Sequence, residues 1–282
     1  MPLNLQAPSA LGYFQQLLAQ AEPFPLLEAA SCLGQDVQPD LDVQDVLLQV
    51  DVLAERLRKL VPWGAGALPR TQMLNSFFYE RLGFAANAND FANPDNSYIH
   101  RVLQTRRGIP ISLAALWMEL AWGIGLQVSG ISFPGHFLVK VQLPEGVLVQ
   151  DPLTGQALGQ AQLYEWLEPY QERWGMSQED MAPLHLFLQP ATGHDIVERM
   201  LRNLQVVYTQ NEHWPKLLPV LDRLLLVRPQ DSTLYRDRGM LLAQLGRRAA
   251  ALQDLQTYVR TAQAATDLPL VEARIELLRT AF

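Results

Sequence analysis

The sequence predicts an α+β protein with a helical opening part, a small antiparallel sheet in its middle and an all-α tail. The first observation is that apolar residues recur at helical spacing along most of the 282 residues, but at strand-like spacing from Leu126 to Asp151. The second is the composition, with 49% hydrophobic and 18% charged residues, which is typical of a folded globular chain. We expect two parts, residues 1–190 and residues 191–282, because this length suits one large domain or two ordinary ones.

The opening third is expected to be helical. Two short helical patterns fill Leu11–Leu33, where two prolines separate them, and apolar residues recur at helical spacing over Asp42–Leu60. A further helix is predicted over Pro69–Leu82, since a glycine follows it as a stop signal. An asparagine-rich loop over residues 83–94 then leads to a short helix, Asn96–Arg106.

The middle of the chain changes from one helix to three strands. A buried helix is predicted from about Ser112 to Trp122, after the turn RRGIP. The strings LQVSGISF, HFLVKVQL and GVLVQD are short, rich in Val, Ile and Phe, and separated by PG and PEG turn signals, so they predict three strands. The loop between the second and third has hairpin length, and these two strands should therefore pair antiparallel.

The tail contains an internal repeat. Positions between 201 and 225 align with positions between 235 and 259 at one constant offset of 34 residues, the period of a tetratricopeptide (TPR) helical hairpin. Two such units and a last helix over Leu268–Phe282 fit the remaining length. Small residues stand where paired helices of the second unit must approach each other, namely Gly239, Ala243, Ala250 and Ala251.

The charge balance and the cysteine count exclude several classes of function. A formal net charge of −7 argues against nucleic-acid and anionic-membrane binding, because both need a basic face. No basic residue precedes Arg56, and the most apolar segment, Ile109–Leu126, is interrupted by an acidic residue and two glycines, so neither a signal peptide nor a bilayer span is predicted. Cys32 is the only cysteine, which rules out an intrachain disulfide and fits a cytoplasmic location. Since no histidine pair has metal-site spacing and no glycine-rich phosphate loop is present, we expect neither a metal nor a cofactor.

Three residues in the middle of the chain could carry acyl chemistry, which needs a nucleophile, a base and a group that orients the base. They are Ser112, His136 and Asp151, in that order. Ser112 would lie at a helix start, where the backbone N–H groups of Ser112 and Leu113 could hold an oxyanion. His136 opens one strand and Asp151 closes the next, so an antiparallel pair places both side chains at the same end of the sheet.

Each of these residues also has a structural interpretation. Ser112 could cap its helix, and His136 and Asp151 could be ordinary turn residues. Taken one at a time, the structural interpretations are favoured. The order of the three residues on a helix followed by two strands nevertheless favours a site, active or relic.

Three further residues are candidates for supporting roles. Asn96 could cap its helix or reach the site as a polar donor. Tyr98 could likewise reach the site, although core packing is the favoured interpretation. Glu119 lies two turns below the serine on the same helix face, where it could pair with Arg106 or Arg107 or point to solvent.

The runs RRGIPIS and FPGHF, the DP of LVQDP and the TPR-like tail closely resemble the SirB family of YchA-like proteins. The resemblance covers most of the chain. It implies a transglutaminase-like (papain-like) core ahead of TPR repeats, and a regulatory association in bacteria. In such cores a cysteine, a histidine and an aspartate occupy the positions of Ser112, His136 and Asp151. The serine departs from that pattern, because a thiol ionises near neutrality beside a helix N-terminus whereas a hydroxyl depends on general-base help.

Two alternative functions follow. The first is a non-catalytic, regulatory interaction protein, in which a degenerate transglutaminase-like core binds a protein or peptide partner and the TPR-like tail adds a docking surface. The second is a serine-dependent acyl-transfer enzyme, that is, a hydrolase, protease or amidase in which Ser112 attacks, His136 acts as base and acid, and Asp151 orients the histidine.

Overall fold

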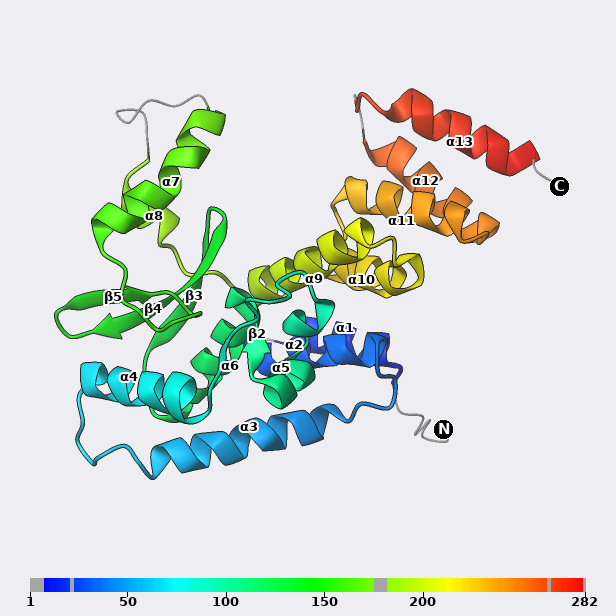
Figure 1. Cartoon of the computed structure of the whole chain (residues 1–282). Coiled ribbons are helices and arrows are strands. Elements are labelled where there is room, and N and C mark those ends of the chain that lie inside the picture. Colours follow the sequence, from blue (N-terminus) through cyan, green and yellow to red (C-terminus); the bar gives the residue numbers. More distant parts are fainter. Residues whose placement is uncertain (1–7, 21–22, 175–181, 263–264, 281–282) are drawn as a thin grey trace. The chain divides into compact units, whose positions relative to one another are not determined.

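The computed structural model describes residues 8–20, 23–174, 182–262 and 265–280 (Figure 1). The chain forms two compact units. The core unit spans residues 23–200, and the tail unit combines the residues up to 22 with residues 201–282. The N-terminal helix α1 (Ala10–Leu18) therefore belongs with the C-terminal helices, which the sequence did not indicate. The predicted boundary after residue 190 stays a prediction.

The core unit opens with helices, as expected, although some bounds differ from the prediction. The segment predicted as one helix from Pro69 to Leu82 starts at Ala67 and becomes π-helical from Ser76. The segment predicted as Asn96–Arg106 is a 3-10 turn followed by a short helix. The elements are α2 (Leu26–Cys32), η1 (Leu33–Asp36), α3 (Val43–Arg58), α4 (Ala67–Asn75), η2 (Ser76–Arg81), η3 (Pro94–Ser97), α5 (Ile99–Thr105), α6 (Pro110–Gly123), α7 (Gln160–Trp174) and α8 (Leu184–Phe187), and α9 (Gly193–Gln210) continues into the tail unit.

The predicted sheet of three strands is present, in the order β3-β4-β5 with both pairs antiparallel. The turn between β3 and β4 consists of Pro134 and Gly135, and Gly135 has a φ of +71°, the left-handed conformation that a type II turn requires at its third residue. The strands are β3 (Val128–Phe133), β4 (His136–Leu143) and β5 (Gly146–Gln150), and a separate parallel pair joins β1 (Ala85–Ala86) to β2 (Arg107–Gly108).

The two faces of the sheet of β3, β4 and β5 are covered by different helices. Side chains alternate between the faces along a strand, so directly paired residues share a face. On one face Ile131 and Leu138 pack in a hydrophobic cluster with Leu163 and Leu167 of α7. The other face packs on α6, whose residue Trp117 is fully buried. His136 pairs with Phe133 of the first cluster, which places the histidine on the α7 side.

A buried polar network ties α6 to α4 and to the sheet. The Trp117 indole N–H donates to Asn75 Oδ1 at 2.9 Å. Asn75 Nδ2 in turn donates to Gln150 Oε1 at 3.2 Å and to the Gly155 carbonyl at 3.1 Å. Since buried polar groups without partners cost about 1–3 kcal/mol each, this network fixes how the helix lies on the sheet.

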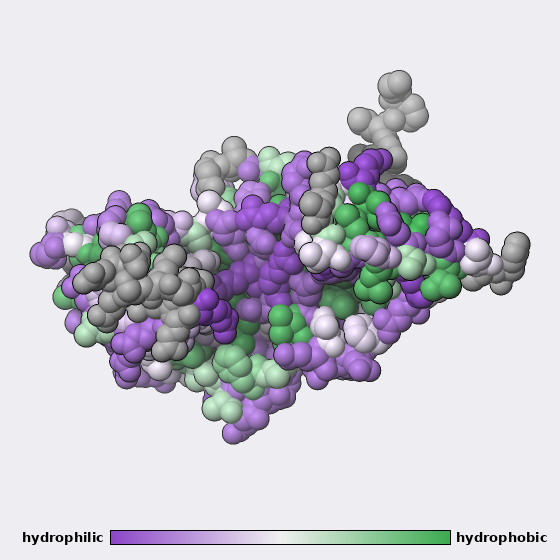
Figure 2. Space-filling model, turned by 90° about the horizontal axis from the view of Figure 1, so that it is seen from above, coloured by the Kyte–Doolittle hydropathy of each residue, from purple (hydrophilic) through white to green (hydrophobic). Residues whose placement is uncertain are grey.

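No helix in the described ranges combines the length and the apolar composition that crossing a bilayer requires. Apolar side chains that remain exposed are distributed over several helices and loops. Figure 2 shows hydrophobic side chains in separate patches among hydrophilic ones on one face.

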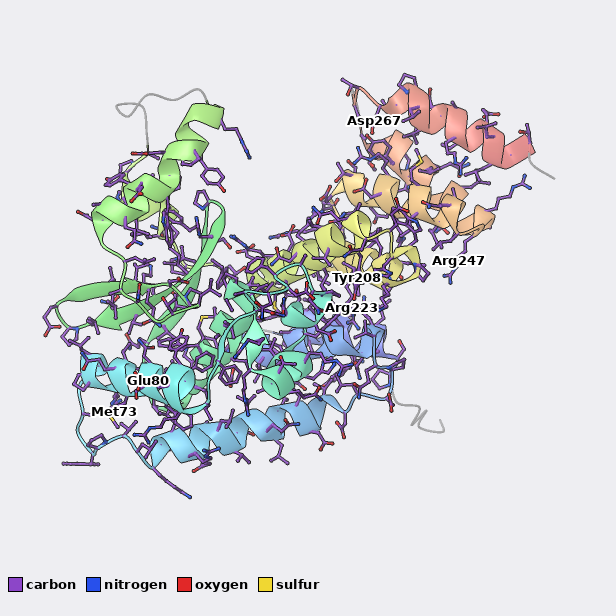
Figure 3. All side chains as sticks on the ribbon, viewed as in Figure 1. Met73, Glu80, Tyr208, Arg223, Arg247 and Asp267 are labelled. Atoms are coloured by element: carbon purple, nitrogen blue, oxygen red, sulfur yellow. The ribbon has the colours of Figure 1, made fainter. Side chains whose placement is uncertain are left out.

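The tail unit consists of α1, the end of α9 and four further helices, and it confirms the predicted TPR-like architecture. Adjacent helices pack as hairpins, and Gly239 lets α11 approach Leu255 of α12, because a Cβ at residue 239 would lie 2.8 Å from that leucine side chain. Arg223 of α10, labelled in Figure 3, is 1% exposed and its guanidinium lies 4.8 Å from the ring centroid of Phe14 in α1. The four helices are α10 (Trp214–Val227), α11 (Ser232–Gln244), α12 (Arg248–Thr261) and α13 (Leu268–Thr280).

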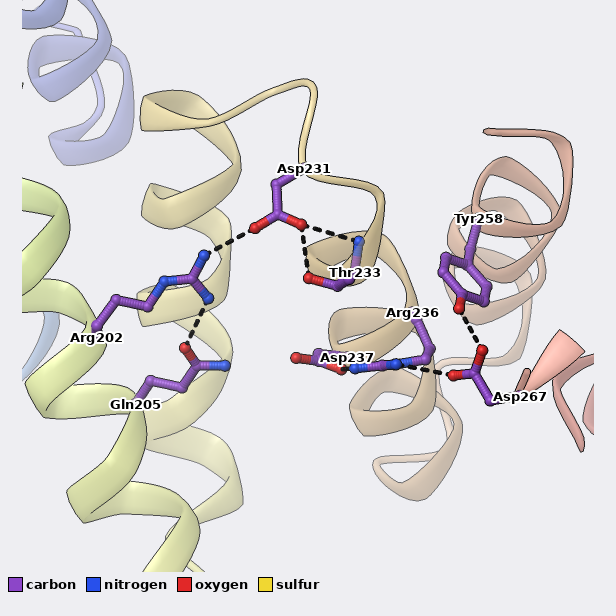
Figure 4. A network of polar contacts seen from close by, with 8 residues as sticks. All are labelled: Arg202, Gln205, Asp231, Thr233, Arg236, Asp237, Tyr258 and Asp267. Carbon is purple, nitrogen blue, oxygen red and sulfur yellow. Dashed lines mark hydrogen bonds and ion pairs between the residues drawn. The ribbon is translucent and has the colours of Figure 1, made fainter. Parts of the chain in front are cut away.

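The same arginine–aspartate pair recurs at the two joints between successive repeats (Figure 4). Arg202 of α9 binds Asp231, which caps α11, at 2.8 Å. Arg236 of α11 binds Asp267, which precedes α13, also at 2.8 Å. The two arginines lie 34 positions apart, so each occupies the same place in its repeat. Each pair fixes the start of the next repeat to the preceding one.

Arg238 of α11 is a half-buried arginine that forms ion pairs with two aspartates. It contacts Asp222 of α10 and Asp254 of α12, both at 2.7 Å, and Asp254 is 4% exposed. We predict that Arg238→Ala lowers the free energy of unfolding by about 2–4 kcal/mol, because it leaves one buried and one half-buried carboxylate unpaired. Equilibrium urea unfolding of the full chain measures this.

The matched control is Arg279→Ala, which removes an exposed pair with Glu276 in α13. Exposed pairs contribute little, so this variant should change the free energy of unfolding by less than about 0.5 kcal/mol. Equal losses in both variants would contradict the special role of Arg238.

His100 of α5 is buried, and among the described residues neither of its ring nitrogens has a hydrogen-bond partner. Burial lowers the pKa of His100, the neighbouring Arg101 lowers it further, and Asp95 partly opposes them. The native state therefore holds the neutral imidazole at a pH where the unfolded chain already binds a proton. The stability contributed by the neutral ring is fully present above the ordinary histidine pKa of about 6.5 and is lost as pH falls below it.

We predict that the free energy of unfolding falls as the pH drops from about 6.5 towards 5, by at most about 1.4 kcal/mol per pH unit from this residue. The His100→Leu variant should lose that part of the slope, whereas His185→Ala, which alters an exposed histidine of α8, should keep it. Denaturant titrations at several pH values test this, and an unchanged slope in His100→Leu would refute it.

Candidate functional site

Ser112 lies inside the first turn of α6 and not at its start. The helix begins at Pro110, two residues earlier than predicted, because Ile109 has an extended backbone and proline suits the first helical position. Ser112 is 0% exposed. Its Oγ accepts the N–H of Ile109 at 3.1 Å and donates to the carbonyl of Asn96 at 2.6 Å. The serine thus bonds back to the residue before the helix, as in one half of a capping box.

The segment before α6 closes tightly over the serine hydroxyl. A Cβ placed on Gly108 would lie 2.8 Å from Ser112 Oγ and 3.0 Å from the side chain of Leu113. Glycine is therefore required at residue 108 so that β2 can pass over the helix start. Both hydrogen bonds of the hydroxyl are made to main-chain groups under this cover.

His136 is half-buried at the start of β4 and stacks on Trp166 of α7, with ring centroids 4.1 Å apart and planes inclined by 16°. Burial lowers the pKa of His136, while the charge of Asp151 raises it and that of Arg199 lowers it. The histidine is therefore held mainly as the neutral imidazole, the form that can accept a proton.

Asp151 follows β5 and organises a turn. Its carboxylate accepts the N–H of Leu153 at 2.9 Å and contacts the hydroxyl of Thr154 at 3.4 Å. The phenol of Tyr79 donates to the Pro152 carbonyl at 3.0 Å in the same turn. Burial raises the pKa of Tyr79, and the charge of Asp151 raises it further.

The structure brings two of the three predicted residues close to each other. Asp151 acts electrostatically on His136, in agreement with their expected position at one end of the sheet. Ser112 bonds to Ile109 and Asn96, and within the described ranges no hydrogen bond joins it to the histidine. The ring of His136 stacks on α7, whereas α6 covers the opposite face of the sheet. The catalytic role of the three residues stays a prediction.

Asn96 and Leu113 contact the serine region through main-chain atoms. The Asn96 side chain is buried and donates to the carbonyls of Asp90 and Phe91, so it holds the preceding loop. It caps no helix, because Asn93 is the residue that caps the 3-10 turn. The N–H of Leu113 donates to the Ile109 carbonyl at 3.1 Å as part of the helix.

Tyr98 and Glu119 have structural surroundings. Tyr98 is 1% exposed, as core packing predicts. Glu119 is half-buried, and its pKa is raised by burial and then by the charge of Asp51. Within the described part of the chain, neither Arg106 nor Arg107 forms the salt bridge to Glu119 that was one of its predicted roles.

Sequence reasoning missed Asn75 and Trp166, which organise the surroundings of the site. Asn75 joins α4 to Trp117 and Gln150 by hydrogen bonds. The only feature of the sequence that could have indicated this role is that Asn75 is a polar residue directly after Leu74, which is buried. Trp166 carries no signal, because an aromatic residue on an amphipathic helix is ordinary core packing. No cluster of residues that could hold a metal ion occurs in the described ranges.

Comparison with known proteins agrees with this architecture. The family described as "Transglutaminase-like superfamily" matches residues 44–202, and a tetratricopeptide repeat family matches residues 204–276. A crystal structure of menin aligns with a TM-score of 0.40 and 11% identity, over 90% of this chain and 69% of menin, a likeness too weak to carry an argument. The fold and the matched region thus define a transglutaminase-like protein with a TPR region.

Several bacterial relatives cover nearly the whole chain. A UPF0162 protein of Xylella fastidiosa strain Temecula1 is 34% identical over 259 residues, which is 90% of each chain. A UPF0162 protein of Pseudomonas aeruginosa is 30% identical over 85% of each chain, and YchA of Escherichia coli K12 is 24% identical over 83% of this chain and 86% of YchA. The chain belongs to the UPF0162 family, which confirms the predicted resemblance to YchA-like proteins.

We predict that Ser112→Ala destabilises the protein by about 0.5–1.5 kcal/mol, because the hydrogen bonds of the hydroxyl to the Asn96 carbonyl and the Ile109 N–H are lost while the direct Ile109 N–H to Asn96 carbonyl bond at 3.3 Å remains. Urea unfolding measures the loss. Ser76→Ala is the control, since the Ser76 hydroxyl bonds to Glu80 at an exposed position, and its effect should stay below about 0.5 kcal/mol. A Ser112→Ala variant as stable as the wild type would show that the serine does not hold the helix start.

Proposed function

We propose that this protein is a non-catalytic interaction protein, in which the transglutaminase-like core serves as a scaffold and the TPR region docks a protein or peptide partner. The observation that carries the proposal is the bonding of Ser112, whose buried hydroxyl is used in two main-chain hydrogen bonds. The three predicted catalytic residues are then a relic, and the serine has taken a structural role.

The chemistry of serine supports this proposal. A serine nucleophile needs a base that removes its proton during attack and an open approach for the substrate carbonyl. The acceptors within reach of the Ser112 hydroxyl are the main-chain carbonyls of Asn96 at 2.6 Å and Ile109 at 3.1 Å, groups that cannot act as a base. Gly108 covers the same hydroxyl, and attack would require this segment to move away.

The tail supports the docking part of the proposal. TPR helices form extended surfaces on which partner segments bind. Here the arginine–aspartate pairs between repeats fix those surfaces, and Val206 and Leu277 leave apolar side chains exposed by 54% and 60%. The net charge of −7 supports a partner that is neither nucleic acid nor an anionic membrane. Cys32, the only cysteine of the sequence, is buried, which supports action in the reducing cytoplasm.

The catalytic part is tested with a fluorophosphonate probe that labels activated serines. We expect the wild type to stay unlabelled at a dose that labels a control serine hydrolase completely. Labelling that disappears in both Ser112→Ala and His136→Ala would overturn the proposal and establish the acyl-transfer alternative.

The docking part is tested with the immobilised full chain and a bacterial lysate. Val206→Asp and Leu277→Asp should each reduce capture of a partner at least tenfold, since a charge is introduced into an apolar contact. Val147→Asp is the matched control, because Val147 is a residue of β5 in the core unit and is 55% exposed. This variant should capture the partner as the wild type does. Equal capture by all variants would remove the role of the tail.

A further inference from the structure

A groove lies between α3 and α5 of the core unit, away from Ser112 and its neighbours. It has a volume of about 320 Å³. Leu48 and Val52 of α3 form one edge and are 60% and 52% exposed. Its lining consists of Leu48, Gln49, Val52, Leu53, Leu103 and Arg106.

The apolar edge of the groove is not part of the face that α3 buries. Helix α3 buries residues at helical spacing towards the core, from Val43 through Val50 to Leu57. Leu48 and Val52 lie off this face, and their spacing of four residues makes them a ridge along the helix surface. Exposed aliphatic ridges of this kind are suited to a helix that packs alongside.

Arg106 places a cation at the end of this ridge. It ends α5 in the left-handed conformation, with a φ of 58°, which is uncommon for a residue other than glycine. Its guanidinium lies 4.7 Å from the ring centroid of Phe84, and its Nη1 is buried without a hydrogen-bond partner. Burial lowers the pKa of Arg106, and the nearby charge of Arg56 lowers it further.

Three acidic residues lie near the groove in sequence. Asp51 of α3 does not line the groove, and its charge acts on Glu119 of α6. Glu55 of α3 forms an ion pair with Arg58, one helical turn away. Asp95 lies 3.7 Å from Arg101, on another part of α5. The groove therefore combines an aliphatic edge with a desolvated guanidinium, and within the described ranges no carboxylate forms a salt bridge with that guanidinium.

We propose that this groove binds an amphipathic helix of a partner protein, whose aliphatic side chains pack on Leu48 and Val52 and whose carboxylate pairs with Arg106. A helix with apolar residues at i and i+4 matches the ridge, and an acidic residue one turn away reaches the guanidinium. The carboxylate pairs with the guanidinium where Arg106 lines the groove and reduces the repulsion between Arg56 and Arg106. The inference rests on the proposed interaction function and adds a second contact surface with its own partner chemistry.

Charge selects this occupant over a second copy of the chain. In a two-fold dimer through this groove each copy would bring its own Arg106 to the same surface, and the two guanidinium charges would repel each other. An acidic helix instead neutralises Arg106.

The test uses the full-length protein and a synthetic alanine-based helical peptide with leucines at i and i+4 and a glutamate one turn away. Binding is followed by fluorescence anisotropy. The wild type should bind this peptide about tenfold more tightly than the same peptide with glutamine in place of glutamate, since a charge-assisted pair is stronger than a neutral hydrogen bond and a tenfold ratio corresponds to about 1.4 kcal/mol.

Arg106→Gly is the decisive variant. Glycine adopts the left-handed conformation without strain, so the chain should stay folded while the guanidinium is lost. The preference for glutamate over glutamine should disappear in Arg106→Gly and persist in part in Arg106→Lys. Leu48→Asp should abolish binding of both peptides. Arg101→Ala, on the same helix, is the control that should bind normally.

The inference is overturned if neither peptide binds, if the wild type does not distinguish them, or if Arg106→Gly keeps the preference. A dimer in sedimentation velocity that Leu48→Asp dissociates would also overturn it, in favour of a second copy as occupant. Failure here leaves the tail-based capture experiment with Val206→Asp unaffected, so the two proposals can fail separately.

Discussion

The core unit depends on hydrogen bonds to the polar backbone groups at the start of helix α6, which is buried. The first N–H groups of a helix have no partner within the helix. At the start of α6 these groups are buried beneath neighbouring segments of the chain. Ser112 resolves this with one hydroxyl that joins Ile109 to Asn96. The same contact orders three segments, namely the loop before α5, strand β2 and helix α6. The hydrogen bonds of Asn75 to Trp117 and Gln150 hold α6 against the sheet.

Much of the fold could be predicted from the sequence because it depends on periodicity and turn chemistry. The three strands and the 34-residue repeat are such features. The helix start was misplaced by two residues, since Ser112 suits a cap by residue type while Pro110 fixes the actual first position. The grouping of α1 with the tail was not predictable, because it rests on tertiary contacts between α1 and α10, such as that of Phe14 with Arg223, more than two hundred positions away.

The candidate site was predictable in its residues but not in its orientations. The antiparallel pairing of β4 with β5 was predicted, and it brings the start of β4 at His136 and the end of β5 before Asp151 to the same end of the sheet. The face on which the histidine lies depends on the register across the Pro134–Gly135 turn, and its partner Trp166 comes from a helix without a distinguishing pattern. Side chains that meet through tertiary packing leave no local signal, so the sequence identified which residues gather and not what each one bonds to.

Gly108 makes the serine difficult to replace, even by the residue that related cores carry. Its Cα lies so close to Ser112 that a single added carbon at residue 108 would approach Oγ to 2.8 Å. A sulfur atom at residue 112 is larger than oxygen, so it would contact Gly108 more closely. It is also a weaker hydrogen-bonding atom, so its hydrogen bonds to Ile109 and Asn96 would be weaker. Placing a thiol at residue 112 would therefore require a simultaneous shift of β2, so the shape of the glycine segment and the identity of residue 112 depend on each other.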